Sequence, residues 1–235
     1  MINSFFTSVF FLLFSFTAPT TKTESTKATA MASPTTAGAK LAEMYGSINS
    51  NELPLPSFES FSKAVQGFEM LKSQGKITKN LLTIIDFSKS SNTRRLWIIN
   101  MDTKTLLYNT LVAHGRNSGE EYASRFSNLS SSNQSSLGFY ATGEIYTGKH
   151  GESLKLDGLE PGINSNARSR AVVIHAADYV SESFIKQHQR LGRSQGCPAL
   201  PNHLNKEIIS LIKDKSCLFI YHPSRDYAKA TRLIS

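Results

Sequence analysis

Short apolar runs between residues 81 and 222 constrain the fold of this chain more than any other feature of its sequence. They are rich in β-branched and aromatic residues and are separated by turn-forming segments, which is typical of β-strands. The runs are LLTIIDF (81–87), RRLWIINM (94–101), TLLYNTLVAHG (105–115), GFYATGEIYTG (138–148), RAVVIHA (170–176) and SCLFIYH (216–222). A short turn at 102–105 joins the second and third runs as a hairpin. We therefore expect a mostly β domain of the α+β class, with mainly antiparallel strands and helices at its edges.

Helical spacing of apolar residues marks three further segments, 37–48, 57–76 and 202–215. Ser57 and Ser60 are candidate N-terminal caps of the second segment. Its apolar face is expected to consist of Phe58, Phe61, Val65, Phe68 and Leu71. The inward face of the third segment is expected to consist of Leu204, Ile208 and Leu211 or Ile212.

The first 40 residues are predicted to lie outside the folded core. The apolar run FFTSVFFLLFSFTA (5–18) is short for a membrane span, so residues 1–18 are predicted to be a signal peptide. A membrane anchor stays open as the alternative, because MINS lacks Lys and Arg and Pro19 follows the candidate cleavage residue Ala18. Residues 19–40, rich in Thr, Ala and Ser, are predicted to form a flexible tether. A helical segment at 41–78 and the β domain at 79–235 follow.

The net charge of the chain indicates which classes of binding partner suit it. There are 26 Lys and Arg against 18 Asp and Glu, a formal net charge of +8, which favours nucleic acid, anionic lipid or an anionic cell wall. The sequence has no basic run longer than two residues and no aromatic-basic recognition motif. We therefore expect no nucleic-acid partner.

The chain has two cysteines, and three roles are open for Cys197: a packed thiol, half of a disulfide with Cys217, or a nucleophile. Its surroundings, LGRSQGCPAL (191–200), contain parts that acyl transfer requires. Gly196 allows a tight turn in which N–H groups converge on an oxyanion, and Ser194 supplies a hydroxyl to fix that turn or a substrate carbonyl. His175, at the end of the apolar run AVVIH, is the candidate base.

The segment GRNSGEEYASRFSNLSSSNQSS (115–136) is long, polar and crowded with Ser and Asn. A loop of this length inside a compact domain is usually functional or disordered. It is interpreted either as the lining of a peptide groove or as a solvated loop.

VVIHAADYV (172–180) and GRSQGCPAL (192–200) together resemble the signature of the L,D-transpeptidase catalytic domain, the YkuD-like family of bacterial wall enzymes. In that family a histidine on a strand precedes Ser-x-Gly-Cys. Other stretches resemble its murein L,D-transpeptidase branch, namely IIDFSK, NTLVAHGRNSG, SSLGFYATGEIYTGKHG and LDGLEPG. The resemblance covers roughly residues 80–222 and implies an L,D-transpeptidase-like β-sandwich or barrel with peripheral helices, which makes 79–235 the catalytic domain.

The same resemblance implies roles for individual residues. Cys197 becomes the acylated nucleophile, His175 its general base, and Ser194 and Gly196 the oxyanion turn. Cys217 opens an apolar strand, so it is assigned to packing rather than to a disulfide.

The motif also departs from the family pattern. Ala176 stands where a Gly usually follows the histidine, and Pro198 and Ala199 stand where a branched residue and then Arg usually follow the cysteine. Arg193 is the candidate replacement for that arginine in substrate binding.

His114 in VAHG and His150 in GKHG are assigned with Arg193 to substrate binding. As an alternative, both histidines could join His175 and Cys197 as zinc ligands of a metallopeptidase, although no two of them have a short metal-type spacing. We expect no metal and no cofactor.

The implied reaction is acyl transfer on peptidoglycan stem peptides through a thioester on Cys197. If water accepts the acyl group, the enzyme is an L,D-carboxypeptidase, and if the chemistry is lost, the domain is a wall-binding module. The expected location is the periplasm or cell envelope of a bacterium, with the N-terminus as a candidate membrane tether.

Overall fold

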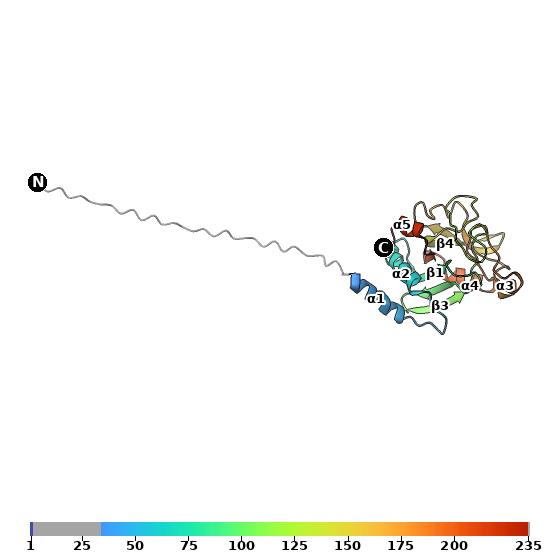
Figure 1. Ribbon diagram of the computed structural model, residues 1–235, viewed down its shortest axis with the longest axis horizontal. Coiled ribbons are helices and arrows are strands. Elements are labelled where there is room, and N and C mark those ends of the chain that lie inside the picture. The colour runs from blue at the N-terminus through green and yellow to red at the C-terminus, as the bar shows by residue number, and fades with distance from the viewer. Residues whose placement is uncertain (2–33, 235) are drawn as a thin grey trace.

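The strand-like runs join into one curled sheet of eight strands in the computed structural model of the chain, which describes residues 1 and 34–234 (Figure 1). The order across the sheet is β3-β2-β1-β8-β4-β5-β6-β7. The strands are β1 (Leu81–Asp86), β2 (Leu96–Asn100), β3 (Thr105–Thr110), β4 (Gly138–Gly148), β5 (Gly151–Gly158), β6 (Val173–Ala176), β7 (Ala199–Leu200) and β8 (Cys217–Tyr221). The described helices are α1 (Pro34–Gly46), α2 (Phe58–Ser73), α3 (Glu182–His188), α4 (Asn202–Ile212) and α5 (Arg225–Ala230). The expected mostly β architecture with peripheral helices is confirmed.

Most neighbouring strands pair antiparallel, as expected, and two pairs are parallel. β1 and β8 pair in parallel at the centre of the sheet, with Ile84 beside Phe219. Their side chains are buried almost throughout, which explains why both strands are continuous apolar runs. The second parallel pair, β6 with β7, forms the opposite end of the sheet from β3.

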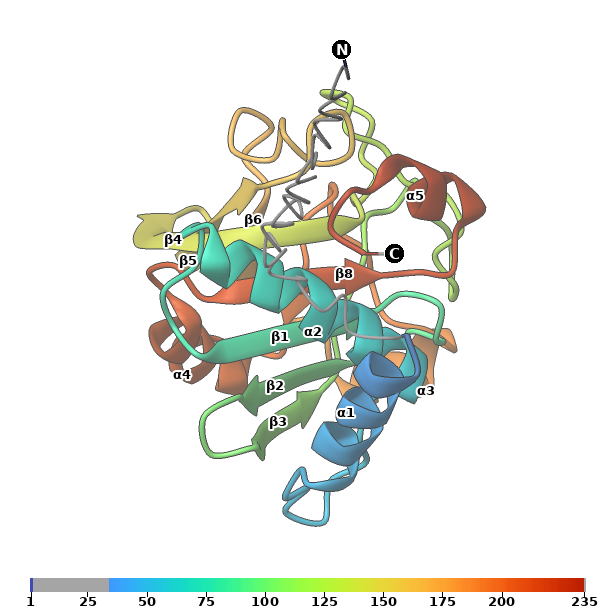
Figure 2. The same cartoon turned by 90° about the vertical axis from the view of Figure 1, so that its left-hand side faces the viewer.

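The helix α2 packs on β1 and β8, and Figure 2 shows it lying across these central strands. Ser57 caps it by accepting the N–H of Ser60, as the sequence predicts. Its approach is close, because a side chain at Gly67 would overlap the ring of Phe139. The predicted core face is confirmed except for Phe58, which is 44% exposed. That residue begins the helix and contacts Tyr45 by its ring edge instead of facing the sheet.

Several boundaries differ from the prediction. α1 starts at Pro34, inside the segment assigned to the tether, because proline is well suited to a first helical position. The signal peptide and most of the tether fall outside the described residues. Among the helices of the described part, none is both long and apolar enough to cross a membrane.

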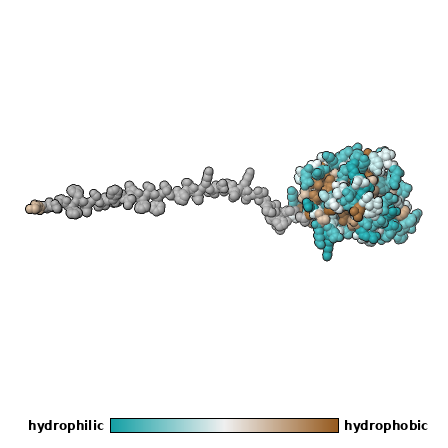
Figure 3. All heavy atoms as spheres, turned by 90° about the horizontal axis from the view of Figure 1, so that it is seen from above, coloured by the Kyte–Doolittle hydropathy of each residue, from teal (hydrophilic) through white to brown (hydrophobic). Residues whose placement is uncertain are grey.

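In α4, Ile208 and Ile212 of the predicted inward face are buried, whereas Leu204 is half-buried and Ile209, which was not predicted, is buried. α4 contacts β4, β5 and β6, so it supports the end of the sheet where the predicted site residues lie. Figure 3 shows a mainly hydrophilic surface on the folded part, interrupted by a few hydrophobic patches.

Candidate active site

A cavity of about 700 Å³ opens beside β6, and most of the predicted site residues line it. They come from the β4–β5 turn, from β6 and the segment before it, from the Cys197 turn and from the polar segment 115–136. The predicted residues among its lining are His150, His175, Arg193, Ser194 and Cys197. Ser130, Ser131 and Asn133 also line it, so the polar segment forms part of the cavity wall rather than only a solvated loop.

The turn that carries Cys197 is fixed by the hydroxyl of Ser194. This hydroxyl accepts the N–H of Gly196 at 3.0 Å and donates to the carbonyl of Cys197 at 2.6 Å. Gly196 has a φ of 125°, a conformation that favours glycine, and a Cβ there would lie 2.9 Å from the carbonyl oxygen of Gln134. The predicted tight turn therefore exists.

Gly196 contributes to this turn through its conformation, and its own N–H is paired with the hydroxyl of Ser194. The N–H of Cys197 has no hydrogen-bond acceptor among the described residues. The N–H of Gln195 is likewise unpaired in the described part of the chain, so the backbone donors that this turn offers an oxyanion are those of Gln195 and Cys197.

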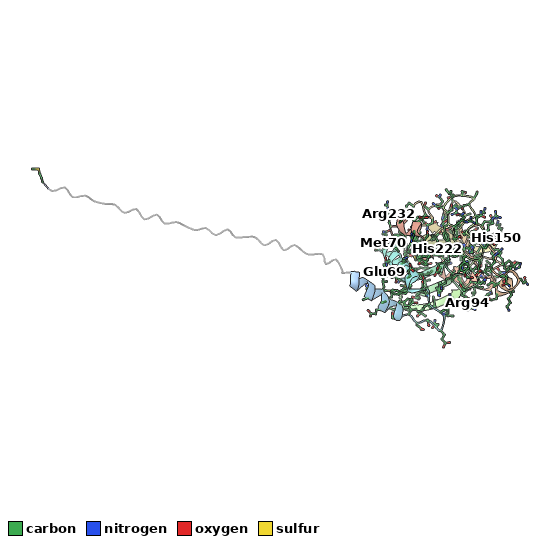
Figure 4. The ribbon with its side chains drawn as sticks, in the orientation of Figure 1. Glu69, Met70, Arg94, His150, His222 and Arg232 are labelled. Atoms are coloured by element: carbon green, nitrogen blue, oxygen red, sulfur yellow. The ribbon has the colours of Figure 1, made fainter. Side chains whose placement is uncertain are left out.

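His175 lies on β6 and pairs in register with Ala199, two residues after Cys197. The ring is 3% exposed, and its Nδ1 lies 2.8 Å from the carbonyl oxygen of Ala176. Because a carbonyl only accepts, Nδ1 carries the proton and Nε2 is left to accept one. The ring stacks on that of His150 with centroids 4.4 Å apart, and His150 lines the same cavity. Figure 4 shows His150 on the far side of the folded part from Met70 of α2.

The sulfur of Cys197 rests against the backbone that leads into His175. The N–H of Val173 donates to Sγ at 3.5 Å, and Sγ lies 3.7 Å from the carbonyl oxygen of Ala171. Val173 and His175 are two residues apart on β6, so their side chains point to the same face of the strand. Cys197, which precedes β7, and His175 of the neighbouring strand β6 therefore line one cavity.

Burial sets the protonation of both groups. It raises the pKa of the Cys197 thiol, while the Val173 N–H, Arg170 and Lys149 lower it by smaller amounts. Burial also lowers the pKa of His175. The resting pair is therefore a neutral thiol and a neutral imidazole.

Both cysteines are free, so they do not form the disulfide that the sequence left open. Cys217 is fully buried in β8, and burial raises the pKa of its thiol. Its assignment to packing agrees with this position.

The assignment of His114 to substrate binding is wrong. Its ring is 1% exposed, packs on Phe87 and does not line the cavity. Nδ1 accepts from the Arg95 guanidinium at 2.8 Å, and Nε2 lies 3.3 Å from the carbonyl oxygen of Gly119. Burial, reinforced by the charge of Arg95, lowers the pKa of His114 to about 3. His114 is thus a neutral internal bridge.

Arg193 lines the cavity, but its guanidinium is directed toward the polar segment. It donates to Glu120 and to the carbonyl oxygen of Gly119, and the latter contact is 3.1 Å long. This pairing leaves Arg193 as a brace of the loop rather than an unpaired group for substrate.

Two cationic residues of the cavity were missed from the sequence, Lys149 and Arg170. Lys149 lies on the β4–β5 turn beside His150, and Arg170 directly precedes the apolar residues that lead into β6. The only available signal was a charge at the edge of an apolar run. No Asp or Glu is among the described residues that line the cavity, so the cavity is cationic.

The zinc alternative is not supported by this arrangement. His114 lies away from the cavity, and both of its ring nitrogens are occupied. No group of three or more His, Cys, Asp or Glu side chains in the described part of the chain is arranged to hold a metal ion.

A cysteine and a neutral histidine line one cavity, beside a turn with an unpaired N–H, and these residue types are the ones that acyl transfer through a thioester uses. The sequence profile of the L,D-transpeptidase catalytic domain family matches residues 54–221. The chain therefore belongs to the L,D-transpeptidase catalytic domain family.

Similar solved structures include an L,D-transpeptidase from Mycobacterium smegmatis (10% identity, 61% of this chain and 59% of that chain, TM-score 0.37). Another, from Mycobacterium tuberculosis H37Rv, has 10% identity over 61% of this chain and 58% of that chain, with a TM-score of 0.38. The L,D-transpeptidase (Yku) from Stackebrandtia nassauensis has 12% identity over 70% and 67%, with a TM-score of 0.37. The match thus spans less than two thirds of the first two chains. No curated protein matches the sequence.

Proposed function

We propose that this protein is an L,D-transpeptidase that transfers peptidoglycan stem peptides through a thioester on Cys197. The observation that carries the proposal is the contact of the Cys197 sulfur with the Val173 N–H, on the strand that presents His175 to the same cavity. This arrangement supplies a nucleophile and a base from rigid backbone, as acyl transfer requires.

The first half-reaction follows from the protonation of the pair. As the sulfur attacks the carbonyl carbon of the third stem residue, the thiol proton passes to Nε2 of His175. The negative charge that develops on the carbonyl oxygen is stabilised by the Cys197 N–H. The amide C–N bond then breaks, the terminal D-alanine leaves with the proton from His175, and a thioester remains on Cys197.

The second half-reaction reverses these roles. An amine of a neighbouring stem attacks the thioester and gives its proton to His175, and the thiol is regenerated as the new amide forms. If water takes the place of the amine, the product is a trimmed stem and the activity is that of an L,D-carboxypeptidase. Because all these steps are proton transfers and acyl exchange, no cofactor or metal is required.

The electrostatics of the cavity favour an anionic substrate. Lys149 and Arg170 line it without a carboxylate beside them, and stem peptides carry free carboxylates. We propose the periplasm or cell envelope as the location, in keeping with this substrate and with the leader-like residues 1–18.

The proposal is tested by incubating the protein with purified disaccharide tetrapeptide and analysing the products by mass. Cross-linked dimer is expected, and it should disappear in Cys197→Ala but persist in Cys217→Ala, the matched control. A tripeptide product alone would select the carboxypeptidase. If the tetrapeptide stays unchanged and no D-alanine is released, the protein is instead the wall-binding module.

A further inference from the structure

Arg170 donates four hydrogen bonds to the polar segment, and neither nucleophile nor base chemistry accounts for them. Its Nη1 donates to the carbonyl oxygen of Ser127 at 2.7 Å and to the hydroxyl of Ser136 at 2.6 Å. Its Nη2 donates to the carbonyl oxygen of Gln134 at 2.7 Å and to the hydroxyl of Ser132 at 3.2 Å. A single half-buried guanidinium thus gathers both ends and the middle of segment 127–136.

Segment 127–136 is itself bonded to the nucleophile turn. Ser135, buried between two of the residues that Arg170 holds, donates its hydroxyl to the carbonyl oxygen of Gly196 at 3.1 Å. The same hydroxyl accepts the N–H of Gly115 at 3.0 Å. The position of the peptide before Cys197 therefore depends on a segment whose conformation Arg170 fixes.

A second connection reaches the sulfur from the other side. Ala171, the residue after Arg170, has a φ of 54°, and its carbonyl oxygen lies 3.7 Å from Sγ of Cys197. This left-handed conformation is costly for alanine and persists only where the surroundings enforce it. The N–H groups of Ala171 and Val172 donate to the carbonyl oxygens of Arg168 and Ala167 and hold this turn. The side chain of Arg170 joins the same turn to segment 127–136.

The charge of Arg170 is not neutralised by a carboxylate, because all four of its contacts are carbonyl or hydroxyl oxygens and no described acidic residue pairs with it. Arg170 lowers the pKa of the Cys197 thiol against the larger effect of burial. The other titratable or charged side chains around the cavity are Tyr146, Lys149, His150, His175, Tyr179 and Arg193.

We infer that Arg170 is a positioning residue for acyl transfer, which clamps segment 127–136 onto the Cys197 turn and so keeps the Cys197 N–H aimed at the acyl carbonyl. The inference rests on the proposed function for the identity of the reaction.

The test compares two reactions of Cys197 in the full chain. Acylation by a carbapenem needs an aligned oxyanion donor, whereas alkylation by iodoacetamide needs only an accessible thiolate. In Arg170→Gln, acylation should slow by about 30-fold or more, because a misplaced N–H donor stabilises the oxyanion less. Alkylation in alkaline buffer should stay within about twofold of the parent rate. Arg170→Lys should restore acylation only in part, because an ammonium cannot make the forked contacts.

Arg168→Gln is the matched control. Arg168 lies two residues away and pairs with Asp157 and Glu144 on the exposed side. It should leave both reactions unchanged. If Arg170→Gln is acylated at the parent rate, or if acylation and alkylation fall together, the positioning role is wrong.

Hydrogen–deuterium exchange separates this inference from the proposed function. If the parent protein is not acylated at all, the proposed function fails, and exchange alone then decides the positioning role. Arg170→Gln should exchange faster than the parent in peptides covering both 127–136 and 191–200. Faster exchange confined to 127–136 would overturn the inference.

Discussion

Lowering the pH from about 7.5 to about 4.5 should cost the parent protein stability that a His114→Gln variant retains. His114 is buried, accepts a hydrogen bond from the Arg95 guanidinium and faces the Gly119 carbonyl oxygen. A proton on Nδ1 would break the bond from Arg95 and place a second cation beside it. The folded state therefore resists protonation, whereas the unfolded chain accepts the proton freely.

The magnitude follows from the displacement of the pKa of His114 from 6.5 to about 3. A depressed pKa gives stability that is complete above the unfolded value and is lost as the pH falls below it. At about pH 4.5 the unfolded chain binds the proton and the folded chain does not, so the loss is about 2 × 1.36, or about 2.7 kcal/mol.

Urea unfolding at several pH values, followed by tryptophan fluorescence, measures this loss. Gln retains an acceptor and a donor but does not titrate, so the parent should lose about 2.7 kcal/mol more than His114→Gln between the two pH values. His203→Gln, a change at an exposed residue of α4, is the control for histidine replacement. Parallel stability curves for the parent and His114→Gln would refute the reasoning.

Three further predictions concern the site and its support. His175→Ala should lower turnover by about two to four orders of magnitude without unfolding the protein, as measured by product formation and circular dichroism, while an active variant would exclude His175 as the base. Because burial lowers the pKa of His175, the acid limb of the pH–rate profile should lie below the ordinary imidazole value of 6.5, and a limb above that value would contradict the burial argument. Burial raises the pKa of Glu160, so the stability that this group contributes at low pH should decline as the pH rises through that pKa. In urea titrations Glu160→Gln should not show this decline, and identical pH dependence of the two proteins would contradict the prediction.

The sequence predicted the strands that are buried on both faces, because continuous apolar runs leave little choice of structure. It did not predict β5, since GESLKLDG mixes charged and apolar residues and only three of its eight residues are buried. β7 has two residues and α5 has six, which is too short for a periodic signal.

At the site, the sequence predicted the residues whose roles depend on local motifs, and failed where the role depends on distant partners. The Ser194 turn at Gly196 follows from four neighbouring residues, and the structure contains it. The burial of His114 depends on Arg95, which is distant in the sequence, and the clamp of Arg170 depends on a segment more than thirty residues earlier. These contacts are set by the packing of the sheet, which residue spacing does not reveal.

The central claim, that Cys197 is the acylated nucleophile, is tested most directly by intact mass and peptide mapping after brief exposure to disaccharide tetrapeptide. One acyl adduct is expected on the peptide that contains Cys197, with the mass of the disaccharide stem without its terminal D-alanine. Parent protein that converts the tetrapeptide while carrying no adduct at Cys197, or Cys197→Ala protein that converts it equally well, would contradict the account.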